Sequence, residues 1–245
     1  MKKIISIIIA TYNASKTLKR CLDSIISQKT DGIEILVIDG FSTDSTMKIV
    51  KSFGERIDYS ISEKDKGIYD AWNKGVNVAH GDWIMFLGAD DYLLDGSIKL
   101  YMNYLSNGDY SNMDIISARC KYVKDGRFID IRGEKYDYKT FCRYMNISHG
   151  STLHNRNLFV ELGKFDLSYR ICADYEFLLR KVLIAEFINS PTFCMEAGGM
   201  WCSARGLVET YRLRRQHKTI PLSLNCYLFI KGLGGLYYRK LLNRQ

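Results

Sequence analysis

The chain has 245 residues, 47% of them hydrophobic and 25% charged, and its formal net charge is +8. This length allows one large α/β domain or a domain with a tail, and the composition excludes a disordered chain. No apolar stretch reaches the ~20 residues that span a bilayer.

The basic excess lies at the end of the chain. From Arg205 onward there are nine Lys and Arg residues and one acid, Glu209, so residues 1–204 are neutral overall. We therefore predict a domain over 1–204 and a basic amphipathic segment over 205–245. Such a segment is expected to touch an anionic surface.

The N-terminus and the cysteines indicate the compartment. The stretch Met1-Lys2-Lys3-IISIIIA resembles the start of a signal peptide, but no small-residue cleavage site follows, so we expect a first strand and a cytosolic protein. The seven cysteines are scattered and form no C-x-x-C pair. Neither a zinc site nor a disulfide framework is indicated, and most cysteines are expected in the core.

The first hundred residues alternate between strand and helix patterns. Buried β-branched or apolar runs predict strands over 4–10, 33–39, 57–62 and 83–87. Apolar residues at helical spacing predict helices over 15–28, 44–53 and 68–79. This alternation predicts βαβ units and an α/β fold with a mostly parallel central sheet flanked by helices.

The pattern is less regular after residue 97. We predict a helix over 97–106, a strand over 114–119, a hairpin around Asp125-Gly126, helices over 155–162 and 172–184, and a strand over 187–195. Two helices, over 203–219 and 221–243, complete the chain. Gly232, Gly234 and Gly235 argue against one straight helix at the end.

Polar side chains follow three of the predicted strands. Thr11-Tyr12-Asn13 follows the first, Asp39-Gly40 the second and Asp90-Asp91 the fourth. Ligands of open α/β sheets bind at the carboxyl ends of the strands. Each group alone could be a turn or a helix cap, but the three together indicate a ligand site.

These motifs support a family resemblance. TYN, IDGFSTDST and GIYDAWNKGVNVAHGDWIMFLGADD resemble, in order and spacing, the nucleotide-sugar-binding half of family-two glycosyltransferases with the GT-A (Rossmann-like) fold. The resemblance covers about residues 3–200 and is strongest to bacterial members that build surface polysaccharides such as O-antigen, capsule or exopolysaccharide. It implies a nucleotide-binding half over 1–96, an acceptor half over 97–204, and inverting transfer of a hexose from a UDP-sugar.

The resemblance also implies a divalent cation, Mn²⁺ or Mg²⁺, which would offset the charge of the leaving diphosphate. The D-x-D pattern of the family would require an acid at position 88, where this chain has Gly88. Asp90 matches the last carboxylate of the motif and is the expected metal ligand. Asp91 is a second ligand or a sugar contact. The alternative is that both acids cap the helix that begins near Asp95.

Further residues are assigned by the same resemblance. Asp39 is expected near the uracil or ribose, while Thr11, Tyr12 and Asn13 would line the base pocket, with Tyr12 available to stack. Asp65 and Asn73 would face the nucleotide, and Trp72 would pack.

A general base is needed because a sugar hydroxyl is a poor nucleophile. The stretch YRICADYEFLLRK resembles the acidic motif of the family, and Asp174 is the expected base. Glu176 is the alternative, but residues two apart on a helix face different directions. Asp174 could also be only a helix N-terminal acid.

The resemblance leaves alternative roles open at the other matching positions. His149 could contact the diphosphate or the acceptor, or be structural, and His154 is expected on the surface. Gly198-Gly199 and Ser203 resemble a loop that closes over the donor. Trp201 could stack on a sugar ring or pack in the fold.

The basic tail mixes Arg and Lys with Leu, Phe and Tyr, as segments that lie on anionic membranes do. This suggests a cytoplasmic protein, peripheral on the inner face of the cell membrane, acting on a saccharide carried by a polyprenyl diphosphate. The alternative is a packed helical pair with a solvated basic face.

The sequence leaves two other functions as alternatives. A nucleic-acid-binding module would use the tail, but the tail lacks a known signature, and no nucleic-acid partner is expected. A nucleotidyltransferase would need a basic glycine-rich loop after the first strand, which TYNASKT matches poorly.

Overall fold

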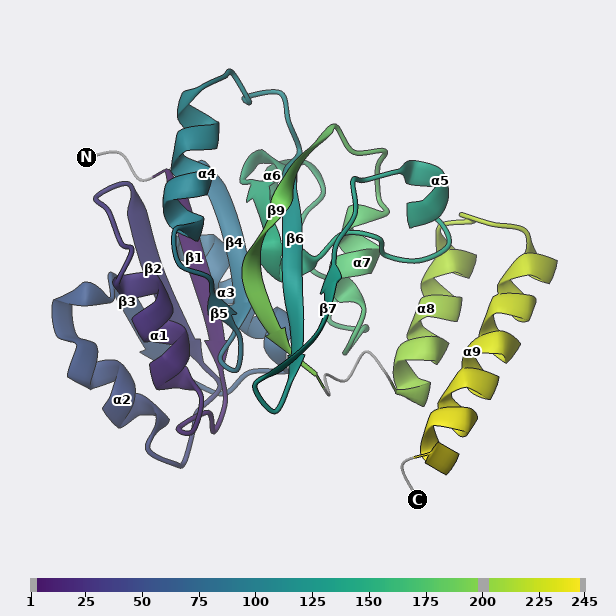
Figure 1. The fold of residues 1–245 in the computed structure, drawn as a ribbon, viewed down its shortest axis with the longest axis horizontal. Coiled ribbons are helices and arrows are strands. Elements are labelled where there is room, and N and C mark those ends of the chain that lie inside the picture. The colour runs from purple at the N-terminus through teal and green to yellow at the C-terminus, as the bar shows by residue number, and fades with distance from the viewer. Residues whose placement is uncertain (1–3, 198–202, 243–245) are drawn as a thin grey trace.

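A computed structural model describes residues 4–197 and 203–242 of the chain (Figure 1). One twisted nine-stranded sheet runs through the molecule in the order β3-β2-β1-β4-β8-β6-β9-β5, and β7 pairs with β6. Helices cover both faces of this sheet, and the predicted α/β fold is confirmed.

The first half of the sheet is parallel. It consists of β1 (Ile5–Thr11), β2 (Ile33–Asp39), β3 (Tyr59–Ser62) and β4 (Trp83–Gly88). Every residue of β1 and β2 is buried, as expected for strands covered on both faces. Asp39 lies beside Thr11 of β1 and Ser62 of β3, and Gly88 lies beside Ala10. The four strands therefore end at nearly one level, and the residues that follow them share one rim.

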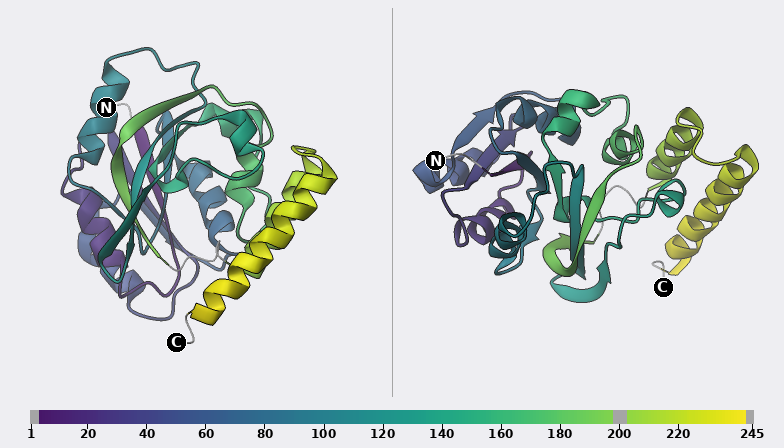
Figure 2. Two further views of the ribbon diagram at one scale, coloured as in Figure 1. Left: turned by 45° about the vertical axis from the view of Figure 1, so that its right-hand side comes forward. Right: turned by 90° about the horizontal axis from the view of Figure 1, so that it is seen from above.

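The alternation of side chains along β1 divides the core in two. Ile5, Ile7 and Ile9 pack with α1 (Leu18–Ile26), α2 (Thr46–Phe53) and α4 (Ser97–Ser106). Ile8 and Ala10 point to the other face and pack with α3 (Ile68–Val78), α6 (Asn157–Glu161) and α7 (Ala173–Leu178). The view from above in Figure 2 shows the sheet between these helices.

The second half of the sheet is mixed rather than mostly parallel. β6 (Ile115–Lys124) pairs in parallel with β9 (Ala185–Glu196) but antiparallel with β7 (Arg127–Arg132) and β8 (Thr152–Asn155). β5 (Tyr92–Leu93) pairs antiparallel with β9. The predicted hairpin is confirmed, with positive φ at Asp125 (49°) and Gly126 (74°).

Several short elements differ from the sequence-based prediction. β5, β8, α5 (Tyr138–Phe141) and the 3₁₀ turns η1 (Gly54–Arg56) and η2 (His149–Ser151) were not predicted. The helix predicted over 172–184 ends at Leu178. The chain leaves the helix there because Ile184 forms hydrogen bonds with the backbone N–H and the carboxylate of Asp114, at the start of β6.

The last two helices, α8 (Ala204–Gln216) and α9 (Leu222–Leu242), lie side by side at one end of the molecule, with α9 outermost (Figures 1 and 2). Leu213 of α8 is fully buried in the same cluster as Phe141 and Phe177. Helix α8 is thus packed on the body of the protein, and α9 rests on α8. The domain division at residue 204 stays a prediction.

Helix α9 is continuous, and the expectation of a glycine break was wrong. Gly232 lies against α8, where a Cβ atom would come within 2.7 Å of the Leu207 side chain, so the glycine allows close helix packing. In the part of the chain that the structure describes, no helix is both long and apolar enough to cross a bilayer.

Candidate active site

A pocket of about 450 Å³ opens at the carboxyl ends of β1 and β4. It brings together five residues predicted from the sequence, namely Thr11, Tyr12, Asn13, Asp65 and Asp90. The remaining wall is formed by small or aliphatic side chains and by the first turn of α3. Residues separated by about 80 positions in the chain therefore line one hollow.

Asp39 lies beneath this rim and is completely buried. Its carboxylate accepts hydrogen bonds from the Thr11 hydroxyl (2.8 Å), the Ser62 hydroxyl (2.6 Å), and the hydroxyl and backbone N–H of Ser42 (2.5 and 2.9 Å). Burial alone would raise the pKa of Asp39, but these bonds outweigh it and hold the pKa below the ordinary value. The carboxylate thus ties together the loops that follow β1 and β2.

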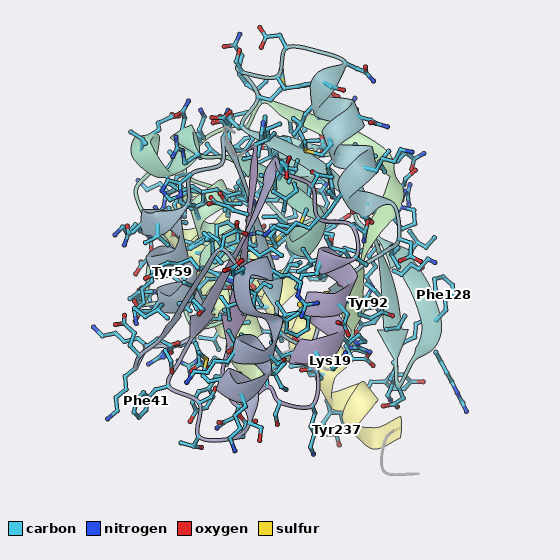
Figure 3. All side chains as sticks on the ribbon, turned by 90° about the vertical axis from the view of Figure 1, so that its left-hand side faces the viewer. Lys19, Phe41, Tyr59, Tyr92, Phe128 and Tyr237 are labelled. Atoms are coloured by element: carbon cyan, nitrogen blue, oxygen red, sulfur yellow. The ribbon has the colours of Figure 1, made fainter. Side chains whose placement is uncertain are left out.

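Those two loops hold each other in position. Asn13 donates its backbone N–H to the Ser42 hydroxyl (2.8 Å) and accepts from the backbone N–H of Thr43 (2.9 Å). Asn13 and Phe41 both have positive φ, 47° and 68°, which is rare for a side chain as large as Phe. Tyr12 and Phe41 remain exposed at this rim, at 66% and 53%, and Figure 3 shows Phe41 at the molecular edge. Sequence reasoning missed Phe41, although it lies within IDGFSTDST.

Asp65 approaches the end of β2 because position 40 is glycine. A Cβ atom there would lie 2.5 Å from Asp65 Oδ2. The other carboxylate oxygen accepts the backbone N–H of Gly67 (2.8 Å), at the entrance to α3. Asp65 therefore joins the second strand end to the helix that lines the pocket.

The two acids after β4 converge above Gly88. A Cβ atom at position 88 would lie 2.8 Å from Asp90 Oδ1 and 3.1 Å from Asp91 Oδ2. Burial, followed by the negative charge of Asp90, raises the pKa of Asp91 well above its ordinary value. Arg20, which sequence reasoning missed, donates to the backbone carbonyl of Asp90 (2.7 Å) and lies over the ring of Tyr92.

Asp174 lies in the first turn of α7. Its Oδ1 accepts a hydrogen bond from the Tyr69 hydroxyl (2.9 Å), which also contacts the backbone carbonyl of Ile171 (2.6 Å). Burial raises the pKa of Asp174. Tyr69 follows Ile68, a lining residue of the pocket, so this hydrogen bond ties Asp174 to the helix that forms one wall of the pocket.

Glu176 has different neighbours. It pairs with Arg180 (2.5 Å) and with His217 (2.9 Å), the residue directly after α8, and its side chain is 3% exposed. Burial alone would raise the pKa of Glu176, but the bonds to His217 and Arg180 lower it below the ordinary value. The two carboxylates of α7 thus face different partners, and Asp174 is the one bonded to the helix that lines the pocket.

Asn73 is turned away from the pocket. Its amide forms two hydrogen bonds with the backbone of Phe165, at 3.0 and 2.9 Å, and so fixes a loop 92 residues later. Trp72, which was expected to pack, is 7% exposed and stacks on His149.

His149 stacks on the rings of Trp72 and Phe86, which also contact each other. Burial lowers its pKa to about 3, so the ring is neutral near pH 7. His154 was expected on the surface but is fully buried, because it belongs to the central strand β8 and packs against Phe86. Gly198, Gly199 and Trp201 lie outside the described residues.

A larger hollow, of about 610 Å³, lies at the amino ends of β1 and β4, near Trp83 and Arg156. We assign the site to the smaller pocket, since parallel sheets bind ligands at the carboxyl ends of their strands and the paired acids lie there.

A twisted α/β sheet with an acidic pocket at this rim is the architecture of a GT-A glycosyltransferase. The Glycosyl transferase family 2 profile matches residues 6–175, and the chain belongs to this family. A PGL/p-HBAD biosynthesis glycosyltransferase of Mycobacterium bovis is 36% identical over 183 residues, which are 71% of this chain and 68% of that relative.

Solved structures share the fold at lower identity. TarS of S. aureus superposes with a TM-score of 0.71 and 17% identity over 94% of this chain, which spans 43% of TarS. The mannosyltransferase PcManGT from Pyrobaculum calidifontis, in complex with GDP-Man and Mn²⁺, gives a TM-score of 0.68 and 18% identity over 97% of this chain and 74% of that protein. At such identities the likeness shows the fold alone.

Proposed function

We propose that this family-two glycosyltransferase moves a hexose from a UDP-sugar, with inversion, to a hydroxyl of a lipid-linked saccharide during bacterial surface polysaccharide synthesis. One observation carries the proposal. The first turn of α3 lines the pocket that gathers Thr11, Tyr12, Asn13, Asp65 and Asp90, and Tyr69 of the same turn hydrogen-bonds the half-buried Asp174 carboxylate. One helix thus connects the proposed donor pocket to the proposed base.

The residues at the rim fit a divalent cation. One carboxylate oxygen each of Asp90 and Asp91 lies next to Gly88, and no cluster of three potential ligands occurs among residues 4–197 and 203–242. Mg²⁺ and Mn²⁺ suit such a site, since they accept one or two carboxylates together with phosphate oxygens and water. When bound, the cation would offset the charge that develops on the leaving diphosphate.

Asp174 would remove the proton of the acceptor hydroxyl while that oxygen attacks the anomeric carbon. Its raised pKa suits this role, because a carboxylate that binds a proton more tightly is a stronger base. The proton passes to Asp174, the new glycosidic bond forms, and the bond to the diphosphate breaks. Direct displacement inverts the anomeric carbon and needs no nucleophilic side chain.

The donor proposal is tested by ligand binding and turnover. UDP with Mn²⁺ should raise the melting temperature, since a ligand at 100 times its dissociation constant stabilises a protein by about 2.7 kcal/mol. EDTA should remove most of this shift and stop the release of UDP from a panel of UDP-hexoses. Stabilisation by GDP but not UDP would reassign the donor, and full turnover in EDTA would remove Asp90 from its proposed role.

Helix α9 supports the proposal of a lipid-linked acceptor. Tyr227, Ile230, Tyr237 and Tyr238 are 59–68% exposed and recur at helical spacing, with Lys231 beside them. The opposite face carries Asn225, Phe229 and Gly232, which contact α8. An aromatic and basic face of this kind suits the surface of an anionic membrane. The C-terminal end of α9 lies at the same end of the molecule as the carboxyl ends of β1 and β2 (Figure 1).

Vesicle binding tests this part of the proposal. The protein should sediment with vesicles that contain phosphatidylglycerol but less with pure phosphatidylcholine, and salt should weaken the binding. Replacing Ile230 and Tyr237 with Ser should reduce binding without changing UDP affinity, because each side chain forfeits roughly 1.5–3 kcal/mol of possible apolar burial. Val160→Ser, which changes an exposed apolar residue on α6, is the matched control. Equal binding of all variants would count against α9 as the contact.

A further inference from the structure

The acid in the basic tail, Glu209, reaches back to the segment that carries the proposed base. Glu209 lies on α8, and its side chain is 7% exposed despite its charge. Its carboxylate accepts the backbone N–H groups of three consecutive residues, Arg170 (3.0 and 3.1 Å), Ile171 (2.8 Å) and Cys172 (3.1 Å). These residues directly precede α7, whose first turn holds Asp174.

Three adjacent N–H groups that converge on one carboxylate fix the path of the backbone. Successive amides of this kind form an anion-binding concavity, and charge-assisted hydrogen bonds are stronger than neutral ones. The same segment is fixed from the other side, because the Tyr69 hydroxyl bonds both the Ile171 carbonyl and the Asp174 carboxylate. Glu209 and Tyr69 thus hold the base between α8 and α3.

The segment bound by Glu209 also touches the donor side. The Arg170 guanidinium donates to the backbone carbonyl of Lys66, which stands between Asp65 and Gly67 of the pocket. A shift of residues 170–172 would therefore move the base relative to the donor pocket. A misplacement of ~1 Å at a reacting group can lower the rate on the order of 10²-fold.

We propose that Glu209 is a positioning residue, which sets the location of the Asp174 carboxylate relative to the donor. This inference rests on the proposed function and adds a role for α8, a helix that the family match over residues 6–175 does not include. Glu209 does not touch the reacting atoms. It acts through the backbone of residues 170–172.

A double-mutant cycle tests the proposal. The variants are Glu209→Ala, the isosteric Glu209→Gln, Asp174→Asn and the pair Glu209→Ala with Asp174→Asn. The rate measured is UDP release from the UDP-hexose that the wild-type protein uses fastest. We expect Glu209→Ala to lower kcat on the order of 10²-fold while the KM for the donor changes little. Glu209→Gln should lower kcat less, because its one side-chain oxygen still accepts hydrogen bonds from the backbone N–H groups.

The cycle separates positioning from general stability. In Asp174→Asn the side chain at position 174 can no longer act as a base, so its exact location matters little. Glu209→Ala should therefore cause almost no further loss of kcat in the Asp174→Asn background. A role only in stability would instead lower the rate by the same factor in both backgrounds, and this would overturn the proposal. UDP affinity with Mn²⁺ shows that each variant is folded.

The outcomes distinguish this inference from the function on which it rests. A wild-type protein with no turnover, or an Asp174→Asn variant with normal kcat, would contradict the proposed function or its base. Normal kcat in Glu209→Ala, beside an inactive Asp174→Asn, would overturn the positioning role alone.

Discussion

The two sides of the proposed site are built differently. The donor wall, the side proposed to bind the nucleotide-sugar, consists of the loops after β1, β2 and β4, which meet because neighbouring parallel strands end together. The base wall, the side with the proposed base, consists of the short helix α7, which Glu209 of α8 and His217, directly after α8, hold in place. Strand order positions the first wall, and long-range side-chain contacts position the second.

This difference shows in the carboxylates. Asp39 accepts four hydrogen bonds from Thr11, Ser42 and Ser62, and its pKa is lowered. Asp174 accepts from the Tyr69 hydroxyl and from backbone N–H groups, but burial outweighs these bonds and raises its pKa. The hydrogen bonds of Asp39 thus keep that carboxylate charged, whereas burial increases the proton affinity of Asp174. A raised proton affinity is the property that the proposed base requires.

The largest effect should follow from removing the proposed base. Asp174→Asn should lower kcat by ~10²–10⁴-fold, because the amide cannot accept the proton of the acceptor hydroxyl. Binding of UDP with Mn²⁺ should persist, since Asp174 is outside the pocket lining. Calorimetry and single-turnover rates measure the two properties. In the wild-type protein kcat should rise with pH through the raised pKa of Asp174, above the ordinary value of about 3.9.

The second acid of α7 should behave in the opposite way. Glu176→Gln leaves Arg180 and His217 without their anion, and breaking a buried ion pair costs about 3–5 kcal/mol of unfolding free energy. Urea denaturation should show this loss, while kcat at a temperature where the variant is folded should stay near normal. A large loss of kcat with unchanged stability would make Glu176, rather than Asp174, the base.

On the donor wall, Asp39→Asn should weaken the fold by roughly 1–3 kcal/mol at pH 7, because hydroxyl and N–H donors would then face an amide NH₂ group. The lowered pKa of Asp39 means that the wild-type carboxylate stabilises the fold above its unfolded pKa of about 3.9. This advantage is lost as the pH falls through the lower folded-state pKa. Urea midpoints of the two proteins should therefore differ at pH 7, and the difference should narrow as the pH is lowered below about 3.9.

The smallest expected effect concerns Gly88. In Gly88→Ala the new methyl group would crowd Asp90 Oδ1 and Asp91 Oδ2, so the pair should shift and the Mn²⁺-dependent part of UDP binding should weaken by about 10-fold. Titration of UDP with and without Mn²⁺ measures that part. Gly234→Ala is the matched control, since a Cβ atom there meets no atom within 4 Å. Unchanged binding in Gly88→Ala would show that these two carboxylates do not share a cation.

Sequence patterns located the donor wall because its geometry is local. The apolar runs predicted β1, β2 and β4, and parallel pairing brings the ends of such strands together, so Thr11, Tyr12, Asn13 and Asp90 could be grouped in advance. The same reasoning failed for Asn73, which bonds to the backbone of Phe165 instead of lining the pocket. A periodicity shows which face of a helix is buried but not which distant loop covers it.

The sequence by itself therefore determined the α/β alternation, the rim where the strands end and the acids that follow them, since each depends on neighbours a few residues away. Only the tertiary structure decided that Glu176 faces His217, that His154 is buried, and that Glu209 holds residues 170–172. These outcomes depend on contacts between segments some 40 to 70 residues apart, such as Glu209 with Ile171 and His154 with Ile84. Burial leaves a polar group only the partners that packing brings to it, and no local pattern encodes that choice.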